Sequence, residues 1–224
     1  HYQSDWLPFY LSRGFGVVLS NYRGYGPTAG KYGRPYPSAL KRDAATVLAA
    51  VRGKFPSAKV MVHGESMGGM VACSLASCPQ GRDSIGLAYV DRTFRDLPTV
   101  GASLLKFAWI ERAMRMLVPW DTDNVRDWLN ITCPKMCAND PNDTMIADRS
   151  CLKAGVAAQV CAEAVASGEK WAVGLGATLP LWNDPEGTAA TSLCGAWNAL
   201  RSLLSANAVR DPQAIRRVLS LVHF

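Results

Sequence analysis

The stretch VHGESMGGMVACSLA (residues 62–76) places Ser66 between Gly64 and Gly68. The apolar run Ala58–Gly64 ahead of the serine predicts a buried strand, and the small apolar residues behind it predict a helix. A strand that turns sharply into a helix needs small residues at the turn, because the two elements approach closely there. The stretch therefore predicts either a nucleophilic serine on a tight strand-to-helix turn or a Gly-Ser bend without reactivity.

The regions on both sides of this stretch alternate between strand and helix patterns. Apolar runs predict strands at Phe15–Tyr22, Ala58–Gly64, Ile85–Asp91 and Cys133–Asp140, and helical patterns cover residues 4–13, 39–53, 68–77, 100–118, 150–166 and 190–206. Such alternation indicates an α/β fold, a three-layer sandwich with a mostly parallel sheet. Functional sites in such sheets lie at the carboxyl ends of the strands, where Ser66 is predicted.

The composition is that of a soluble globular protein with a single domain over residues 1–224. Hydrophobic residues make up 49% of the chain and charged residues 19%, so a core can form. No apolar run approaches the length of a transmembrane helix. The net charge of +6 is spread along the chain, which favours ordinary surface charge over a nucleic-acid partner.

The seven cysteines and three histidines predict neither a disulfide framework nor a metal site. The cysteines are odd in number and are not tightly spaced. A zinc site built on Cys133 and Cys137 would need two further ligands close by. Buried, reduced thiols are the simpler interpretation. They slightly favour a cytoplasmic location, and we expect no metal and no cofactor.

Four motifs follow one another in the order that one known family uses. They are NYRGYGPTAGK (Asn21–Lys31), GESMGG (Gly64–Gly69), DRTFRDL (Asp91–Leu97) and CPKMCANDPNDTMI (Cys133–Ile146). With them the chain resembles the α/β-hydrolase superfamily, in the branch of serine-aminopeptidase-like and acyl-hydrolase proteins, over roughly residues 15–157. The resemblance implies an α/β-hydrolase fold with a cap segment at 94–122 and a divergent helical C-terminal region at 150–224.

The resemblance also assigns catalytic roles to particular residues. It matches Ser66 to the nucleophile, the backbone N–H of Met67 to an oxyanion donor, and Asp143 to the acid that orients a histidine. Asp140 is the competing acid. Asp143 is preferred because the family places its acid just before a small-x-apolar run, which residues 144–146 provide. The alternative for both aspartates is an Asx-turn cap in a Pro-Asn loop.

The base of such a triad is a histidine that follows the acid in the sequence. His223 alone does so, because His1 and His63 precede Asp143, and His63 is expected to point into packing. His223 lies 80 residues after Asp143, whereas a few tens are usual in the family. A helical insertion across 150–215 accounts for the excess. The alternative is that His223 merely stands beside a last strand and that the base lies beyond the chain.

The family's pattern is incomplete in this sequence. The family builds half of its oxyanion hole from a His-Gly-type loop after its third strand, and this chain starts near the helix that follows that loop. We therefore expect the first strands and one oxyanion donor to lie upstream in a longer protein, or the chain to be a degenerate relative.

The function that these residues favour is a serine hydrolase. It would cleave an ester, thioester or peptide bond of a small-molecule, acyl or peptide substrate through an acyl-enzyme on Ser66. The alternative is a catalytically inactive, hydrolase-like binding scaffold. A nucleotide site is disfavoured, because GESMGG has neither a Lys-Ser/Thr pair nor G-x-G-x-x-G spacing. Membrane association and oligomeric state stay open.

The segment between Phe94 and Trp120 is rich in large apolar residues. An apolar cap there would suit an acyl chain or an apolar side chain of a substrate. The alternative, which we favour, is ordinary core packing of an amphipathic helix.

Overall fold

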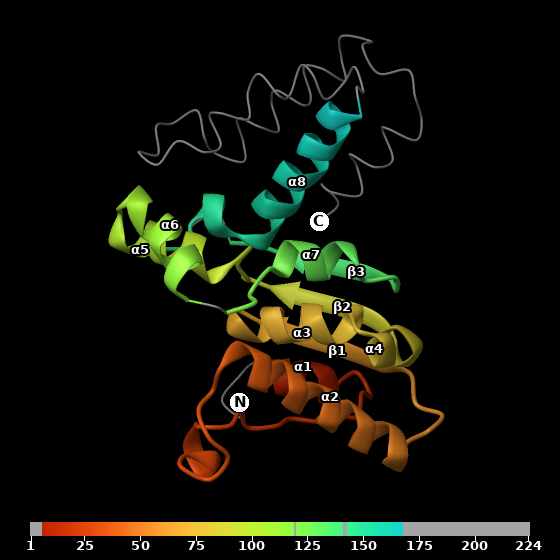
Figure 1. The fold of residues 1–224 in the computed structure, drawn as a ribbon. Helices are drawn as coiled ribbons and strands as arrows, with labels where there is room; N and C mark the ends of the chain where they lie inside the picture. The colour runs from red at the N-terminus through yellow and green to blue at the C-terminus, as the bar shows by residue number, and fades with distance from the viewer. Residues whose placement is uncertain (1–5, 119, 141–142, 168–224) are drawn as a thin grey trace.

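The computed structural model describes residues 6–118, 120–140 and 143–167. Within these ranges three strands form one sheet, in the order β1 (Val60–Glu65), β2 (Ile85–Asp91) and β3 (Lys135–Ala138), and both pairings are parallel. Helices lie between the strands along the chain and beside the sheet in space (Figure 1). The predicted α/β fold with a parallel sheet is therefore confirmed.

The helices predicted at residues 4–13, 39–53, 68–77 and 150–166 are present close to those positions, whereas two short helices, at 79–84 and 124–129, were not predicted. The described helices are α1 (Trp6–Leu11), α2 (Pro37–Lys54), α3 (Met67–Ser77), α4 (Pro79–Ser84), α5 (Leu97–Leu105), α6 (Ala108–Leu117), α7 (Asn124–Leu129) and α8 (Leu152–Ala166). Two short 3-10 turns, Gly26–Thr28 and Asp148–Ser150, lie in loops. The helix predicted at residues 190–206 lies outside the described residues.

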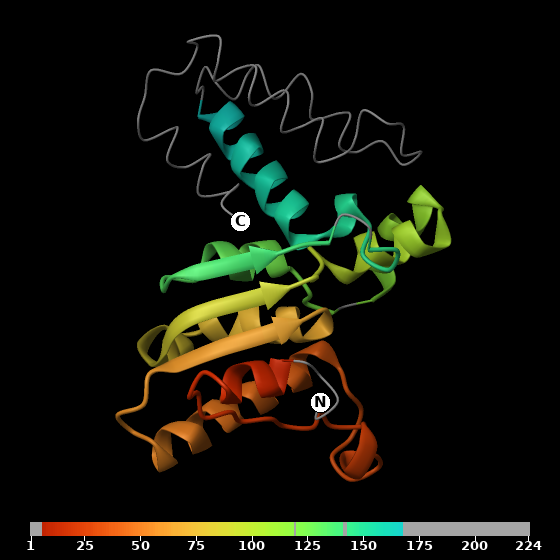
Figure 2. The same cartoon turned by 180° about the vertical axis from the view of Figure 1, so that it is seen from behind.

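The three strands end at the same edge of the sheet. β1 and β2 stay paired to their last residues, Glu65 with Asp91, and Asp91 is paired in turn with Ala138 of β3. The arrowheads of the three strands point to one side in Figure 2. The segments that follow the strands, including Ser66 and the loop after β3, therefore meet at this edge.

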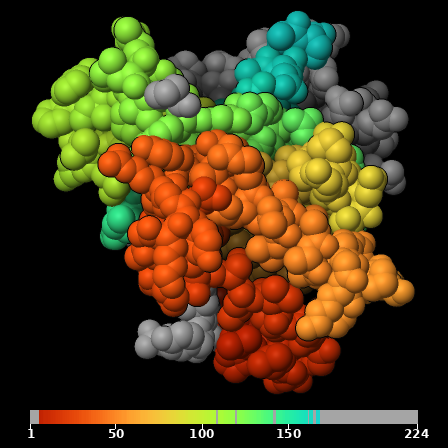
Figure 3. All heavy atoms as spheres, turned by 60° about the horizontal axis from the view of Figure 1, so that its bottom comes forward, coloured from red at the N-terminus to blue at the C-terminus, as the bar shows by residue number. Residues whose placement is uncertain are grey.

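The core lies between the sheet and a layer of helices. Alternate strand residues, among them Val62, Ala88 and Val90, pack against the buried Ala72 and Cys73 of α3. Helices α7 and α8 extend the same cluster with Val125, Trp128, Leu152 and Val156. Figure 3 shows the atoms of α2 and of the loop before it on the outer side of the molecule. Burial of these apolar side chains is the main favourable term in folding.

The opposite face of the sheet carries α1. The Trp6 ring of α1 lies 4.6 Å from the ring of His63 on β1 and 5.8 Å from the ring of Tyr89 on β2. His63 and Tyr89 are paired neighbours in the sheet, one position along from the core-facing Val62. Since successive strand residues point to opposite faces, helices cover part of both faces of the sheet.

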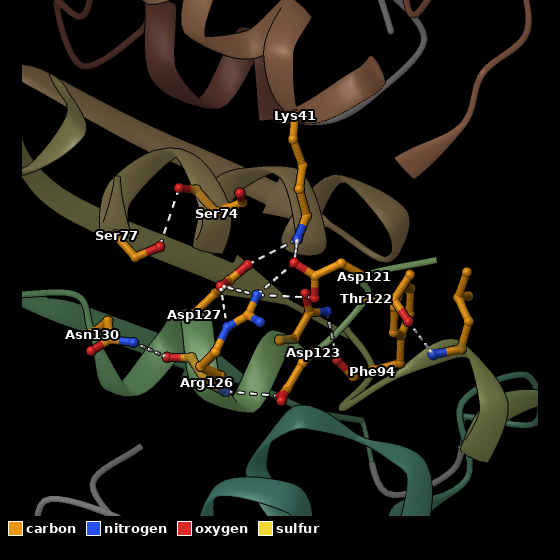
Figure 4. A network of polar contacts seen from close by, with 12 residues as sticks. Lys41, Ser74, Ser77, Phe94, Asp121, Thr122, Asp123, Arg126, Asp127 and Asn130 are labelled. Atoms are coloured by element: carbon orange, nitrogen blue, oxygen red, sulfur yellow. Dashed lines mark hydrogen bonds and ion pairs between the residues drawn. The ribbon is translucent and has the colours of Figure 1, made fainter. Parts of the chain in front are cut away.

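An ion cluster with a buried pair at its centre, Lys41 and Asp127, ties α2 to α7 (Figure 4). Lys41 Nζ lies 3.0 Å from Asp127 Oδ2, and these two side chains are only 14% and 9% exposed. Arg126 also pairs with Asp127, at 3.0 Å, and with Asp121, at 2.7 Å. Because a buried charge is costly unless it is paired, Asp127 depends on both of its cations.

Lys41→Met is expected to lower the free energy of unfolding by about 2 kcal/mol, because it leaves the buried Asp127 with Arg126 alone. The matched control is Lys59→Met, since Lys59 is exposed and forms no ion pair within the described ranges. Urea denaturation followed by circular dichroism measures both variants. Equal midpoints for the two would contradict a stabilising role of the Lys41 ion pair.

Residues Phe15–Tyr22 do not form the predicted strand. In the part of the chain that the structure describes they have no regular secondary structure, and no neighbouring segment pairs with them. Phe15, Val18 and Leu19 are about half exposed. A strand requires a partner for its backbone hydrogen bonds, and an apolar run alone does not supply one.

The single helix predicted at residues 100–118 is two helices. α5 ends at Leu105 and α6 begins at Ala108, because Lys106 adopts the left-handed conformation with φ 59°. Asp96 caps α5, accepting a hydrogen bond from the Thr99 N–H at 2.8 Å, and the guanidinium of Arg115 on α6 lies 2.9 Å from the same carboxylate. Burial alone would raise the pKa of Asp96, but these contacts outweigh burial and lower it.

Candidate functional site

Ser66 occupies a strained turn between β1 and α3. Its φ of 55° and ψ of −119° are unusual for a residue with a side chain. The surroundings hold its main chain at both ends: its N–H donates to the Asp91 carbonyl at 3.0 Å, and its carbonyl accepts from the Gly69 N–H at 2.9 Å. The Thr93 hydroxyl donates to the same carbonyl at 2.7 Å. The residue itself is exposed, at the carboxyl edge of the sheet.

The two glycines beside the serine have different physical roles. A Cβ on Gly64 would lie 2.2 Å from the Gly68 carbonyl oxygen and 2.8 Å from the Cβ of Ala72. A Cβ on Gly68 would meet only the Tyr22 hydroxyl, at an ordinary 3.5 Å. Close approach of β1 to α3 therefore requires the first glycine and not the second.

A third glycine, Gly69, packs directly on Thr93. A Cβ on Gly69 would lie 2.4 Å from both Cβ and Oγ1 of Thr93, whose side chain is buried. The absence of a side chain at Gly69 thus lets the Thr93 hydroxyl reach the Ser66 carbonyl. The sequence carried no signal for this contact, because it joins α3 to the loop after β2, two segments that are distant in the sequence.

The loop with the motif NYRGYG lies next to the serine turn. The Tyr22 hydroxyl is the nearest group to the open side of Gly68, and Thr28 Oγ1 donates to the Tyr22 carbonyl at 2.5 Å. Arg23 forms an ion pair with Asp43 of α2. Burial raises the pKa of Tyr22, so its hydroxyl stays protonated at neutral pH.

Met67 is the first residue of α3. The first backbone N–H groups of a helix have no acceptor within the helix. The partial positive charge at this end of the helix also favours a negative group nearby. The backbone of Met67 is thus suited to donate to an oxyanion formed at Ser66.

Asp143 lies in the loop that follows β3, at the same edge as Ser66. Its Oδ1 accepts hydrogen bonds from the backbone N–H groups of Met145, at 2.8 Å, and Ile146, at 3.0 Å. Its own N–H donates to the Asp140 carbonyl at 3.1 Å. The Asx-turn geometry considered as an alternative is therefore present, and it fixes the orientation of the Asp143 carboxylate.

Arg92, which was not predicted to be a functional residue, lies directly after β2 at the carboxyl edge of the sheet. It has φ 44°, and its Nη2 lies 2.8 Å from Glu65 and 3.1 Å from Asp91. Burial lowers the pKa of Arg92, but attraction to Asp91 and Glu65, with a contribution from Asp143, outweighs burial and raises it. A charged residue directly after β2 was the signal that could have identified it, because strand ends of a parallel sheet form the site.

His63 points into aromatic packing, as expected. Its Nδ1 lies 3.1 Å from the Tyr10 hydroxyl, and its ring packs on Trp6 and Tyr89. Burial lowers its pKa, which favours the neutral ring. The other two histidines, His1 and His223, lie outside the described residues.

The thiols that burial shields from water, such as those of Cys137 and Cys151, are poor candidates for chemistry. Cys73, Cys78, Cys133, Cys137 and Cys151 are free, and burial raises the pKa of Cys137 to about 12 and that of Cys151 to about 11. A thiol is nucleophilic only when it is deprotonated. Among the described residues no group of three or more His, Cys, Asp or Glu side chains is arranged to hold a metal ion.

Comparison with known proteins gives one family. A family model described as "Serine aminopeptidase, S33" matches residues 10–171, which is most of the chain. The matched region includes the serine turn, Arg92 and the Asp143 loop. No solved structure matches the chain significantly.

Proposed function

Because this chain belongs to the serine aminopeptidase S33 family of the α/β-hydrolase superfamily, we propose that it is a serine hydrolase with Ser66 as its nucleophile. The observation that carries the proposal is the strained main chain of Ser66. Its φ of 55° is maintained by hydrogen bonds from Thr93 and Gly69 and to Asp91. Strain of this kind persists only where the surroundings enforce it, and it is concentrated at functional sites.

In the proposed reaction Ser66 Oγ attacks the carbonyl carbon of an ester, thioester or peptide bond. A histidine takes the hydroxyl proton, and the Met67 N–H stabilises the negative oxygen of the tetrahedral intermediate. Collapse of the intermediate breaks the bond to the leaving group, which receives that proton, and leaves the acyl group on Ser66. Water activated by the same histidine then releases the acid and restores the serine.

We assign the orienting acid to Asp143 and the base to His223. The support for Asp143 is its place at the carboxyl edge of the sheet and the two backbone N–H groups that fix its carboxylate. A fixed carboxylate can hold a histidine in one tautomer and stabilise the cation that forms. His223 is assigned by its order in the sequence alone, after the serine and the acid.

A fluorophosphonate probe tests the proposal, because it reacts covalently with an activated serine. The wild-type chain is expected to be labelled, and Ser66→Ala is expected to abolish labelling. Ser57→Ala, which changes an exposed serine before β1, is the matched control and should label normally. Loss of labelling in His223→Ala would support His223 as the base. Failure of the folded wild-type chain to react would contradict the proposal and favour the non-catalytic scaffold.

A further inference from the structure

The α5–α6 hairpin projects from the body of the protein at the left of Figure 1. α5 faces inward with the buried Thr99 and Ala102. α6 packs on α5 so closely that a Cβ on Gly101 would lie 2.5 Å from Met114 Sδ. None of the described side chains of α6 is fully buried, so this helix forms an outermost layer.

Large apolar side chains are exposed on this hairpin and directly after it, and we name them the hairpin patch. Its members are Leu104, Leu105, Phe107, Trp109, Met116, Leu117 and Trp120, each between 44% and 78% exposed. The Phe107 and Trp109 rings lie 6.5 Å apart. The favoured interpretation of this segment as ordinary core packing is therefore wrong for these side chains. Several large apolar side chains exposed on one projecting element indicate an interaction site.

Two cations lie within the hairpin patch without an anionic partner. Lys106 and Arg112 are exposed, and neither forms an ion pair in the described part of the chain. Arg115, by contrast, is neutralised by Glu111 at 2.8 Å and Asp96 at 2.9 Å. The patch thus combines aromatic and aliphatic side chains with uncompensated positive charge.

The arrangement along α6 is that of an interfacial helix. Trp109, Arg112 and Met116 are spaced three and four residues apart, so they share one face of the helix. Lys106 and Phe107 form the turn between α5 and α6, directly before this helix. Tryptophan and phenylalanine insert at the boundary between lipid headgroups and acyl chains, while lysine and arginine contact anionic headgroups.

We propose that the hairpin patch docks on an anionic lipid surface. A second copy of the chain is a less suitable occupant, because a two-fold contact would bring the unpaired cations of two identical patches together. Among the helices of the described ranges, none is long and apolar enough to cross a bilayer. The proposal does not depend on the chemistry of Ser66.

Sedimentation of the full chain with phosphatidylcholine vesicles, with and without phosphatidylserine, tests the proposal. Phosphatidylserine is expected to tighten binding by roughly tenfold or more, because two unpaired cations approach the surface. Phe107→Ser/Trp109→Ser is expected to abolish binding, and Lys106→Glu/Arg112→Glu to remove the preference for phosphatidylserine. Phe55→Ser/Lys59→Glu, which changes an exposed apolar residue and an exposed cation elsewhere, should bind normally.

Several results would overturn the proposal. These are no binding to either vesicle, equal binding to both, or unchanged binding by the Phe107→Ser/Trp109→Ser variant. A wild-type dimer in solution that becomes a monomer in that variant would assign the patch to self-association instead. Since the substituted side chains are exposed, far-ultraviolet circular dichroism should show that all variants fold.

Discussion

Gly64→Ala is expected to lower the free energy of unfolding by about 3 kcal/mol, the upper end of what overpacking typically costs and a substantial part of the stability of a domain. The added Cβ would lie 2.2 Å from the Gly68 carbonyl oxygen, which is backbone and cannot rotate away. Relief requires α3 to move off β1, and this movement would open the core at Ala72. Urea denaturation, followed by circular dichroism and tryptophan fluorescence, measures the loss.

The second glycine of the same motif provides the matched control. A Cβ on Gly68 would stand 3.5 Å from the Tyr22 hydroxyl, and Gly68 lies within α3, where alanine is the better helix former. Gly68→Ala should therefore change the free energy of unfolding by less than about 1 kcal/mol, in either direction. Similar losses for the two alanine variants would show that close approach of strand and helix is not the reason for Gly64.

Asp143→Asn is expected to slow the reaction of Ser66 with a fluorophosphonate roughly 10⁴-fold, the effect of removing the orienting acid from a serine triad. Asparagine keeps Oδ1, which accepts from the Met145 and Ile146 N–H groups, so the loop retains its turn. What the variant loses is the negative charge that orients and stabilises the histidine. The second-order rate constant of labelling, measured with excess probe, gives the effect.

Asp140→Asn is the comparison variant for this experiment. Asp140 is exposed, and its carbonyl oxygen, which the substitution preserves, accepts from the Asp143 N–H at 3.1 Å. Its labelling rate should stay within about threefold of wild type, as for a residue outside the reacting groups. A large loss in Asp140→Asn with none in Asp143→Asn would transfer the role of acid to Asp140. Wild-type rates for both would remove both aspartates from the triad.

The fold could be predicted where local pattern suffices. The run Ile85–Asp91 is apolar and bounded by polar residues, and it is β2 in full. The similar run Phe15–Tyr22 failed as a prediction, because a strand also needs a partner, and a partner is not encoded in the run itself. The break between α5 and α6 was not predicted, because Lys106 adopts the left-handed conformation that ends α5. Glycine usually occupies such a position, and a lysine there gives no indication of a helix end.

The serine turn could be predicted because the residues that determine it are close together in the sequence. The steric demand that makes Gly64 necessary arises within eight residues of Ser66, in the strand and helix that flank it. The contacts of Arg92 and Thr93 arise differently, from the register in which Glu65 stands beside Asp91. Register depends on how two distant segments pack. The sequence therefore shows which residue types follow the strands, but the contacts between them could not be predicted from it.

The contact between Gly69 and Thr93 restricts how this protein can change through evolution. Alanine at Gly69 meets both Cβ and Oγ1 of Thr93, so serine at position 93 would relieve only part of the overlap. Removing the hydroxyl as well would release the Ser66 carbonyl. Neither position can therefore drift by itself while the serine turn is under selection. Among relatives that keep the turn, we expect the two positions to vary together or not at all.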